Sequence, residues 1–146
     1  MPRWAEFENA APELAAIGRD RVGQHHFMLL GTVRRDRTAR ISPVGVRIVD
    51  GELTMSVLRD SAKAGDIRRD SRVLLHSPVL HADDPNDELK LRGRALEVDD
   101  PALRERAAMW EPPPELVVYR LELESAAFLA WSKGEVTVTR WDAGGG

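Results

Sequence analysis

A hydroxyl, an arginine and a lysine occur close together in the middle of the chain. Ser56 lies near the end of an alternating apolar run, and Arg59, Ser61 and Lys63 follow it. Ser61 is a favourable N-cap for a short helical pattern that runs to about Asp70, which places Lys63 in the first turn. Free backbone N–H groups at a helix start, together with cationic side chains, form a site for a phosphate-sized anion. The alternative is a capped helix on a solvated basic loop.

Two strands must position these residues. Alternating apolar runs flank Asp50-Gly51, and Asp-Gly between such runs is a strong indication of a hairpin. In the first run the alternation shifts by one residue at Pro43, between Ile41 and Val44, which predicts a bulge that turns the backbone toward a ligand or a bend of the sheet. The second run has two faces, an apolar one with Leu53, Met55 and Val57 and a polar one with Glu52, Thr54 and Ser56.

The remaining patterns predict a mainly β chain. Residues 1–11 form an irregular lead-in, and Pro12 begins a helix that ends near Gly23. Asp100 caps a helix that starts at Pro101, and Pro112–Pro114 stop it. Further strands are expected at 27–33, 73–76, 89–95, 117–123, 128–131 and 136–141. Six to eight antiparallel strands with about three short helices are typical of a small closed barrel, and residues 143–146 are expected to be loosely ordered.

Composition limits the possible classes of protein. The length of 146 residues fits one domain, and a net charge of -3 argues against a nucleic-acid partner, which usually demands a basic surface. The absence of cysteine excludes disulfides, thiolate metal sites and a cysteine nucleophile. No apolar run approaches the roughly 18 residues of a membrane span, and no signal-peptide core is present. We expect a cytoplasmic protein with no membrane partner.

Other motifs offer no competing site. His25 and His26 are adjacent on a predicted strand, where neighbouring side chains point to opposite faces and cannot chelate one ion. The acidic run 83–88 lacks the spacing and the glycine of a calcium loop. The sequence contains no GxGxxG, no P-loop and no GxSxG. Hydrolase and classical dinucleotide-binding functions therefore have no support from motifs, and no metal site is predicted.

From about Gln24 to Trp141 the chain resembles the pyridoxamine 5'-phosphate oxidase-like, FMN-binding split-barrel proteins. The most specific part of the resemblance is ELTMSVLRDSAKAGDIRRDSRVLLH. Here Ser61 and Lys63 match the family's Ser-Arg-Lys, and residues 69–73 match its run into the next strand. ARISPV, residues 39–44, is similar to the strand whose backbone lies along the flavin. The resemblance implies one antiparallel split β-barrel domain over residues 1–146.

The resemblance also implies a set of FMN-binding residues. Lys63 and Ser61 would hold the cofactor phosphate, with help from Ser56 at the end of its strand. The residues implied to border the flavin, partly through backbone groups, are Arg40, Ser42, Pro43 and Val44. No catalytic residue is identified by the match.

Two departures from the family pattern weaken the implied phosphate site. Ala62 stands where the family often has the arginine of Ser-Arg-Lys, and Val57 stands where a phosphate-binding threonine is frequent. Arg59 is a candidate to replace the missing guanidinium from the loop. A hydrogen bond to an ionised group is worth about 1.5–3 kcal/mol, so two losses would cost up to several decades of affinity.

The function implied by the resemblance is that of a flavin-dependent oxidoreductase acting on a small molecule. It implies a homodimer with cofactor sites at the subunit interface. Oxidation of pyridoxamine 5'-phosphate itself is not expected, because the segment WSKGEVTVTRW lacks the Arg-x-His pattern associated with that substrate. Four tryptophans either anchor the interface or pack over the barrel ends: Trp4, Trp110, Trp131 and Trp141.

Two alternatives on the same fold remain open. In the first, a deazaflavin coenzyme replaces FMN, and its longer acidic tail would bind extra cations such as Arg92, Arg94 and Lys133. In the second, the chain is a non-catalytic protein that binds flavin or haem, or a split barrel that has lost its cofactor. The departures at Val57 and Ala62 favour this second alternative.

Overall fold

The computed structural model describes residues 1–110 and 116–144, which form seven antiparallel strands and four helices. The sheet order is β3-β2-β1-β4-β5-β6-β7, and an additional β3–β6 pairing closes six strands into a ring with β7 outside it. The predicted mainly β split barrel is confirmed. The strands are β1 (Phe27–Val33), β2 (Ala39–Val49), β3 (Glu52–Leu58), β4 (Arg72–His76), β5 (Asn86–Glu97), β6 (Leu116–Ser132) and β7 (Glu135–Asp142).

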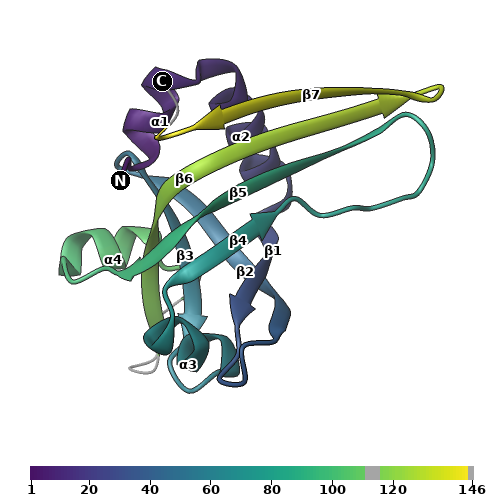
Figure 1. Ribbon diagram of the computed structural model, residues 1–146. Coiled ribbons are helices and arrows are strands. Elements are labelled where there is room, and N and C mark those ends of the chain that lie inside the picture. The colour runs from purple at the N-terminus through teal and green to yellow at the C-terminus, as the bar shows by residue number, and fades with distance from the viewer. Residues whose placement is uncertain (111–115, 145–146) are drawn as a thin grey trace.

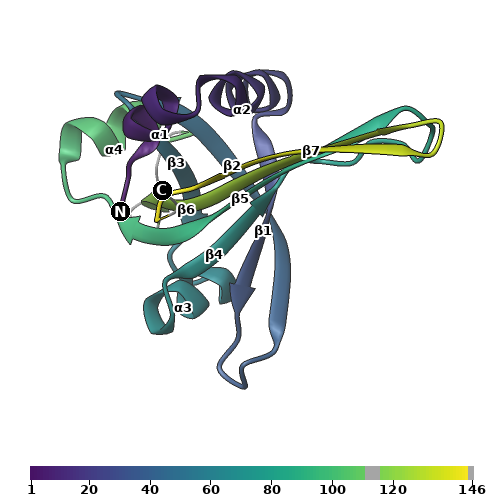
Figure 2. The same ribbon diagram turned by 45° about the horizontal axis from the view of Figure 1, so that its top comes forward.

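Strand β6 joins the barrel to an extension that projects from it. Its first residues pair with β3, and its remainder pairs with β5 and β7. The outer parts of these three strands reach well beyond the ring (Figures 1 and 2). The two strands expected at 117–123 and 128–131 are therefore one. Residues 125–127 continue the strand because they have ladder partners on both sides, and Glu124 is the residue skipped where the β5–β6 register shifts.

The Asp50-Gly51 turn is confirmed, with φ of 51° and 75° at its two central residues. The bulge expected at Pro43 is absent: β1 and β2 pair in unbroken register from Gly45 to Ala39. The alternation shifts because Ile41 points outward and is 72% exposed. In β5–β6 the register instead shifts between Arg92 and Gly93.

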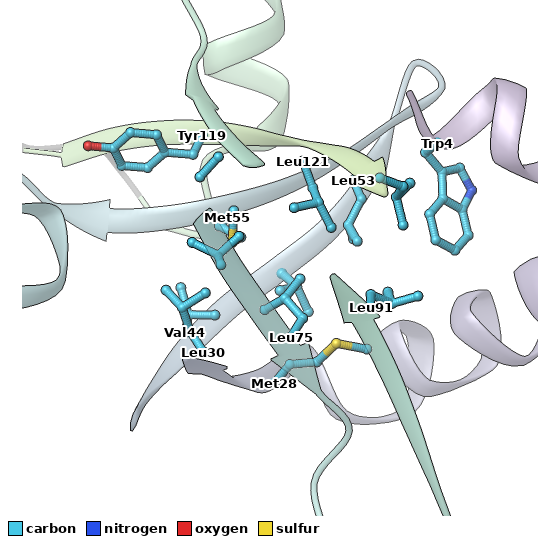
Figure 3. Close-up of a cluster of buried hydrophobic side chains, with 14 of the residues drawn as sticks. Trp4, Met28, Leu30, Val44, Leu53, Met55, Leu75, Leu91, Tyr119 and Leu121 are labelled. Atoms are coloured by element: carbon cyan, nitrogen blue, oxygen red, sulfur yellow. The ribbon is translucent and has the colours of Figure 1, made fainter. Parts of the chain in front are cut away.

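The barrel interior is filled by one face of each strand of the ring (Figure 3). Full burial of a large aliphatic side chain contributes about 1.5–3 kcal/mol, so this cluster supplies the main stabilisation of the barrel. Its fully buried members include Met28, Leu30, Val46, Leu53, Met55, Leu75, Leu89, Leu91, Leu121 and Leu123.

The expectation of an irregular lead-in over residues 1–11 is wrong, because α1 (Trp4–Ala10) is helical. Trp4 and Phe7 are both 0% exposed, and their rings meet edge to face at one end of the barrel. A Cβ on Gly18 would lie 2.6 Å from the Trp4 ring, so only glycine admits this contact. A seven-residue helix is not stable by propensity, and tertiary packing of these two aromatics explains it.

The other helices follow the predicted boundaries closely. Helix α2 (Pro12–His25) begins at the expected proline and ends two residues later than expected, and α3 (Ala62–Arg69) has Ser61 as its N-cap. Helix α4 (Pro101–Ala107) is capped by Asp100. The expected stop at Pro112–Pro114 lies outside the described residues, as do the last two residues of the expected tail. No helix in the described part of the chain has the length and apolar character needed to cross a membrane.

Candidate functional site

The barrel is split beside the first half of β2. Strand β2 pairs with β1 along residues 39–45 but with β3 only along 45–49. Beyond Ser56, β3 continues along β6 instead. Within residues 1–110 and 116–144, therefore, one edge of β2 from Ala39 to Val44 has no strand partner. Its backbone N–H and C=O groups are available to a ligand.

Helix α3 begins at the same end of the barrel, directly after β3 (Figure 1). The Ser61 hydroxyl accepts a hydrogen bond from the Ala64 N–H at 3.3 Å and donates one to the Leu58 carbonyl at 2.7 Å. The N–H groups of Ala62 and Lys63 make no hydrogen bond to any described residue, and the Lys63 ammonium makes no ion pair there. Two amides and one ammonium group can thus bind an anion, while Ser61 is occupied as a cap.

A buried carboxylate fixes α3 to the barrel. Asp66 is 1% exposed, and its oxygens accept hydrogen bonds from Thr32 of β1 at 2.8 Å and from Arg40 of β2 and Arg69 at 2.7 Å each. Burial alone would raise the pKa of Asp66, but the bonds from Arg40 and Thr32 and the two positive charges hold it below its usual value. This network sets the position of α3 and therefore of Lys63.

Sequence reasoning missed this network because its members lie on three separate elements. The only indication was an aspartate in the middle of a short helix pattern, which is usually solvated. Asp66 became interpretable only when the fold brought Thr32 and Arg40 against it.

The predicted β2 residues lie on two faces. Val44 is 3% exposed and packs in the core, and Arg40, on the same face of the strand, is engaged by Asp66. Ser42 lies between them on that face and is half-buried, whereas Pro43 is exposed on the opposite face. These side chains do not converge on one point, so their shared contribution to a site is the unpaired backbone edge.

The predicted β3 residues are also divided between two faces. Val57 is 1% exposed and belongs to the core, so this position offers no polar group to a ligand. Ser56 faces the other way, is 4% exposed and lies opposite Gly45. Met109 packs beside Gly45, 3.1 Å from where a Cβ would stand. Ser56 therefore lies under a covered outer face, and its side chain makes no hydrogen bond to the described residues at the start of α3.

The loop before α3 holds a second group of charges. The Arg59 guanidinium lies 3.5 Å from Glu97, and the Arg59 carbonyl accepts a hydrogen bond from Arg68 at 3.1 Å. Burial, with the charge of Glu97, raises the pKa of Tyr119 against the opposing effect of Arg68 and Arg59. Figure 3 shows the Tyr119 hydroxyl pointing away from the apolar cluster. Arg59 is thus paired with Glu97. Arg68, which the sequence patterns did not single out, donates the hydrogen bond to the Arg59 carbonyl.

No group of three or more histidine, aspartate or glutamate side chains in the described ranges is arranged to hold a metal ion. His76 instead bonds Glu88, with Nε2 2.9 Å from the carboxylate, and places Nδ1 2.6 Å from the Ser77 carbonyl. Hydrogen bonds on both ring nitrogens leave no free ligand atom on this imidazole.

Comparison with known proteins identifies the family. The family model described as pyridoxamine 5'-phosphate oxidase matches residues 17–130. The chain belongs to this family. Its members generally bind a flavin and are typically dimeric. No curated protein matches this chain.

Several solved structures share the fold. A NimC/NimA family protein from Clostridium acetobutylicum has a TM-score of 0.68 and 16% identity, and the match covers 93% of this chain and 98% of that one. PhzG from Burkholderia lata, in complex with tetrahydrophenazine-1-carboxylic acid, has a TM-score of 0.61 and 16% identity, with 97% and 94% covered. A haem-binding protein from Mycobacterium smegmatis has a TM-score of 0.67 and 16% identity, with 83% and 55% covered. This chain spans about half of that last protein. At these identities the likeness shows the fold alone.

Proposed function

We propose that this chain binds FMN at the split between β2 and β3 and acts as a flavin-dependent oxidoreductase on a small molecule. The observation that carries the proposal is the meeting of an unpaired strand edge with a helix start that has two unbonded amides and a lysine. The residues fit the two polar ends of the cofactor. Membership of a family that generally binds flavin supports the same assignment.

Each of the two polar ends of the cofactor has groups to hold it. The Ala62 and Lys63 amides and the Lys63 ammonium would bind the phosphate, since ionised hydrogen bonds are the strong ones. Backbone groups of Ser42 to Val44 would bond the polar edge of the ring system. Bound FMN supplies the capacity to accept and donate a hydride, and the chain binds, orients and tunes it.

The affinity is expected to be modest. Ala62 provides no guanidinium, Val57 is in the core, and Arg40 and Arg59 are paired with Asp66 and Glu97. Each missing charged partner costs roughly ten- to a hundredfold in affinity. Purification is therefore expected to remove part of the cofactor.

We further propose that the chain is a cytoplasmic homodimer with its cofactor sites at the subunit interface. Trp110 supports this assembly, because it is 46% exposed and lies near Gly45 beside the split. A large exposed aromatic next to a site is a suitable interface anchor. Trp4, in contrast, is buried within its own subunit, and Trp141 packs against the core.

The test is titration of the purified protein with FMN and with riboflavin, in which quenching of flavin fluorescence reports binding. Riboflavin lacks the phosphate, so a phosphate site at α3 predicts that FMN binds at least about tenfold more tightly. Equal affinities would contradict the phosphate site, and no binding of either flavin would contradict the function. If only the deazaflavin coenzyme binds saturably, that coenzyme and not FMN is the cofactor.

A further inference from the structure

A groove of about 890 Å³ opens on the outer side of the barrel, beside the last turn of α3. Its floor crosses four strands, because Gly31 pairs with Ile41 on one side and Leu74 on the other, and Leu74 pairs with Arg92. A site of this volume falls within the range of about 300–1,000 Å³ found for small-molecule sites. Of the residues implied to bind FMN, only Arg40 lines it, and Arg92, a candidate for the deazaflavin tail, lines it as well.

The middle of the floor is apolar and open. Ile41 is 72% exposed, an unusual state for an isoleucine in a regular strand. Gly31 beside it has no side chain, and a Cβ there would only touch Leu74, at 3.6 Å. The floor therefore offers a shallow apolar surface on which a ring could lie.

The rim is strongly cationic, although the whole chain has a net charge of -3. Seven arginines line the groove against two carboxylates, and both carboxylates already have partners: Asp70 pairs with Arg72 at 2.6 Å and Glu124 with Arg94 at 3.6 Å. Asp66 engages two more of the seven. Four arginine side chains make no ion pair or hydrogen bond with any described residue: Arg34, Arg35, Arg37 and Arg92.

We propose that this groove binds a small polyanion that carries an apolar ring, of the chemical class of a nucleoside diphosphate. The four unpaired guanidinium groups would contact the phosphates, and the ring would lie on Ile41 and Leu74. One planar guanidinium can donate two parallel hydrogen bonds to two oxygens of a phosphate, which lysine cannot do. All the cationic residues that line the groove are arginines, which fits a phosphate ligand. A polynucleotide is disfavoured, because its partners are usually basic overall.

The experiment is calorimetric titration of the full chain with ADP, inorganic pyrophosphate and adenosine, without magnesium. ADP is expected to bind saturably and more tightly than pyrophosphate, which has only the charge, and than adenosine, which has only the ring. The variant Arg35→Gln/Arg92→Gln is expected to weaken ADP binding at least about tenfold. The matched control is Arg140→Gln, an exposed arginine of β7 that makes no ion pair in the described part of the chain, and it should leave ADP binding unchanged.

A second variant separates the floor from the rim. Gly31→Val keeps every charge and fills the floor, so it is expected to weaken ADP binding while leaving pyrophosphate binding unchanged. The proposal is overturned if ADP shows no saturable binding to the wild type up to about 5 mM, a concentration at which even millimolar affinity would be seen. It is also overturned if Arg140→Gln weakens ADP as much as the double variant does.

Lys63→Gln distinguishes this site from the proposed FMN site. It is expected to leave ADP binding unchanged, because Lys63 does not line the groove. If Lys63→Gln abolishes ADP binding, the nucleotide occupies the FMN site and the proposal for the groove fails. Loss of FMN binding alone would leave the groove intact.

Discussion

The two ends of the barrel are closed in different ways. At the α1 end, Trp4, Phe7 and Trp141 pack ring on ring, with centroids 5.1 and 4.9 Å apart. At the α3 end, a helix is held by one carboxylate with three polar partners, and an edge of β2 is left unpaired (Figure 1). Apolar packing seals an end, whereas a directional polar network fixes a helix and leaves polar groups beside it available. This difference supports the proposal that the cofactor binds at the α3 end.

The largest expected effect is at the sealed end. Trp4→Ala removes a fully buried ring and leaves a cavity between α1, α2 and the barrel. The free energy of unfolding should fall by about 3–5 kcal/mol, measured by urea denaturation. Leu80→Ala, at a side chain that is 68% exposed and has no assigned role, is the control and should change stability by far less. Equal losses in both variants would contradict the description of the α1 end as the sealed one.

Loss of the Asp66 charge at the α3 end should lower the unfolding free energy less than Trp4→Ala does, but it should weaken FMN binding. Asp66→Asn removes the charge that three donors share, while Arg40 and Arg69 remain partly exposed and can be hydrated. We expect a loss of about 2–3 kcal/mol in unfolding free energy and weaker FMN binding, because α3 is no longer held in place. A loss of stability in Asp66→Asn with unchanged FMN affinity would show that the Asp66 network does not position the FMN site.

The pH dependence of this stabilisation has a defined sign. The folded-state pKa of Asp66 lies below its unfolded value, so its contribution is fully present above about pH 4 and disappears as the pH falls through the folded pKa. The stability difference between wild type and Asp66→Asn should therefore shrink in acid. A difference that stays constant down to the acid transition would contradict the assignment.

A gain of function is expected from restoring the family residue at the α3 start. Ala62 is exposed at the first position of the helix, so Ala62→Arg places a guanidinium beside the two unbonded amides without disturbing the core. FMN affinity should rise about tenfold, as one added charged hydrogen bond implies. Riboflavin affinity should not change, and a parallel rise for riboflavin would place the new contact away from the phosphate.

The smallest expected effect concerns the other buried carboxylate. Glu52, at the α1 end, is 5% exposed, lies 3.3 Å from Arg3 and leaves Oε2 without a hydrogen bond among the described residues. Burial raises the pKa of Glu52 despite the charges of Arg3 and Arg120. Glu52→Gln should therefore be neutral or stabilising by about 1 kcal/mol at neutral pH, since a poorly paired buried charge is costly.

The two carboxylates should also respond to pH in opposite directions. Because burial raises the folded-state pKa of Glu52, ionisation of this carboxyl destabilises the fold. This loss of stability appears as the pH rises from about 4.3 through the folded pKa. The advantage of Glu52→Gln over wild type should thus grow with pH in thermal unfolding experiments. An advantage that shrinks with rising pH would mean that Glu52 is better paired than its contacts indicate.

The sequence predicted the features that depend on local chemistry. The Asp50-Gly51 turn, the Ser61 cap and the alternating strands follow from rules that act over a few residues. The helix α1 was missed because Trp4 and Phe7 stabilise it only by long-range packing. The bulge at Pro43 was predicted wrongly because Ile41 faces outward, into a groove that exists only in the folded barrel.

The candidate site was predictable only in part. The position of Lys63 at a helix start could be inferred from its neighbours, and the structure agrees with it. The inward direction of Val57, the pairing of Arg59 with Glu97 and the Asp66 network all depend on contacts between distant segments. Nothing in the local sequence indicated that Arg34, Arg35 and Arg37 of the β1–β2 turn would line one groove with Arg92.

The most direct test of the FMN site is the dissociation constant for FMN of the wild type, Lys63→Gln and Lys133→Asn. Lys133 lies in the β6–β7 turn at a φ of 51°, which asparagine tolerates, so this control removes the same charge far from α3. We predict that Lys63→Gln raises the constant at least about tenfold and that Lys133→Asn leaves it unchanged. Equal constants for all three proteins would contradict a phosphate site at the start of α3.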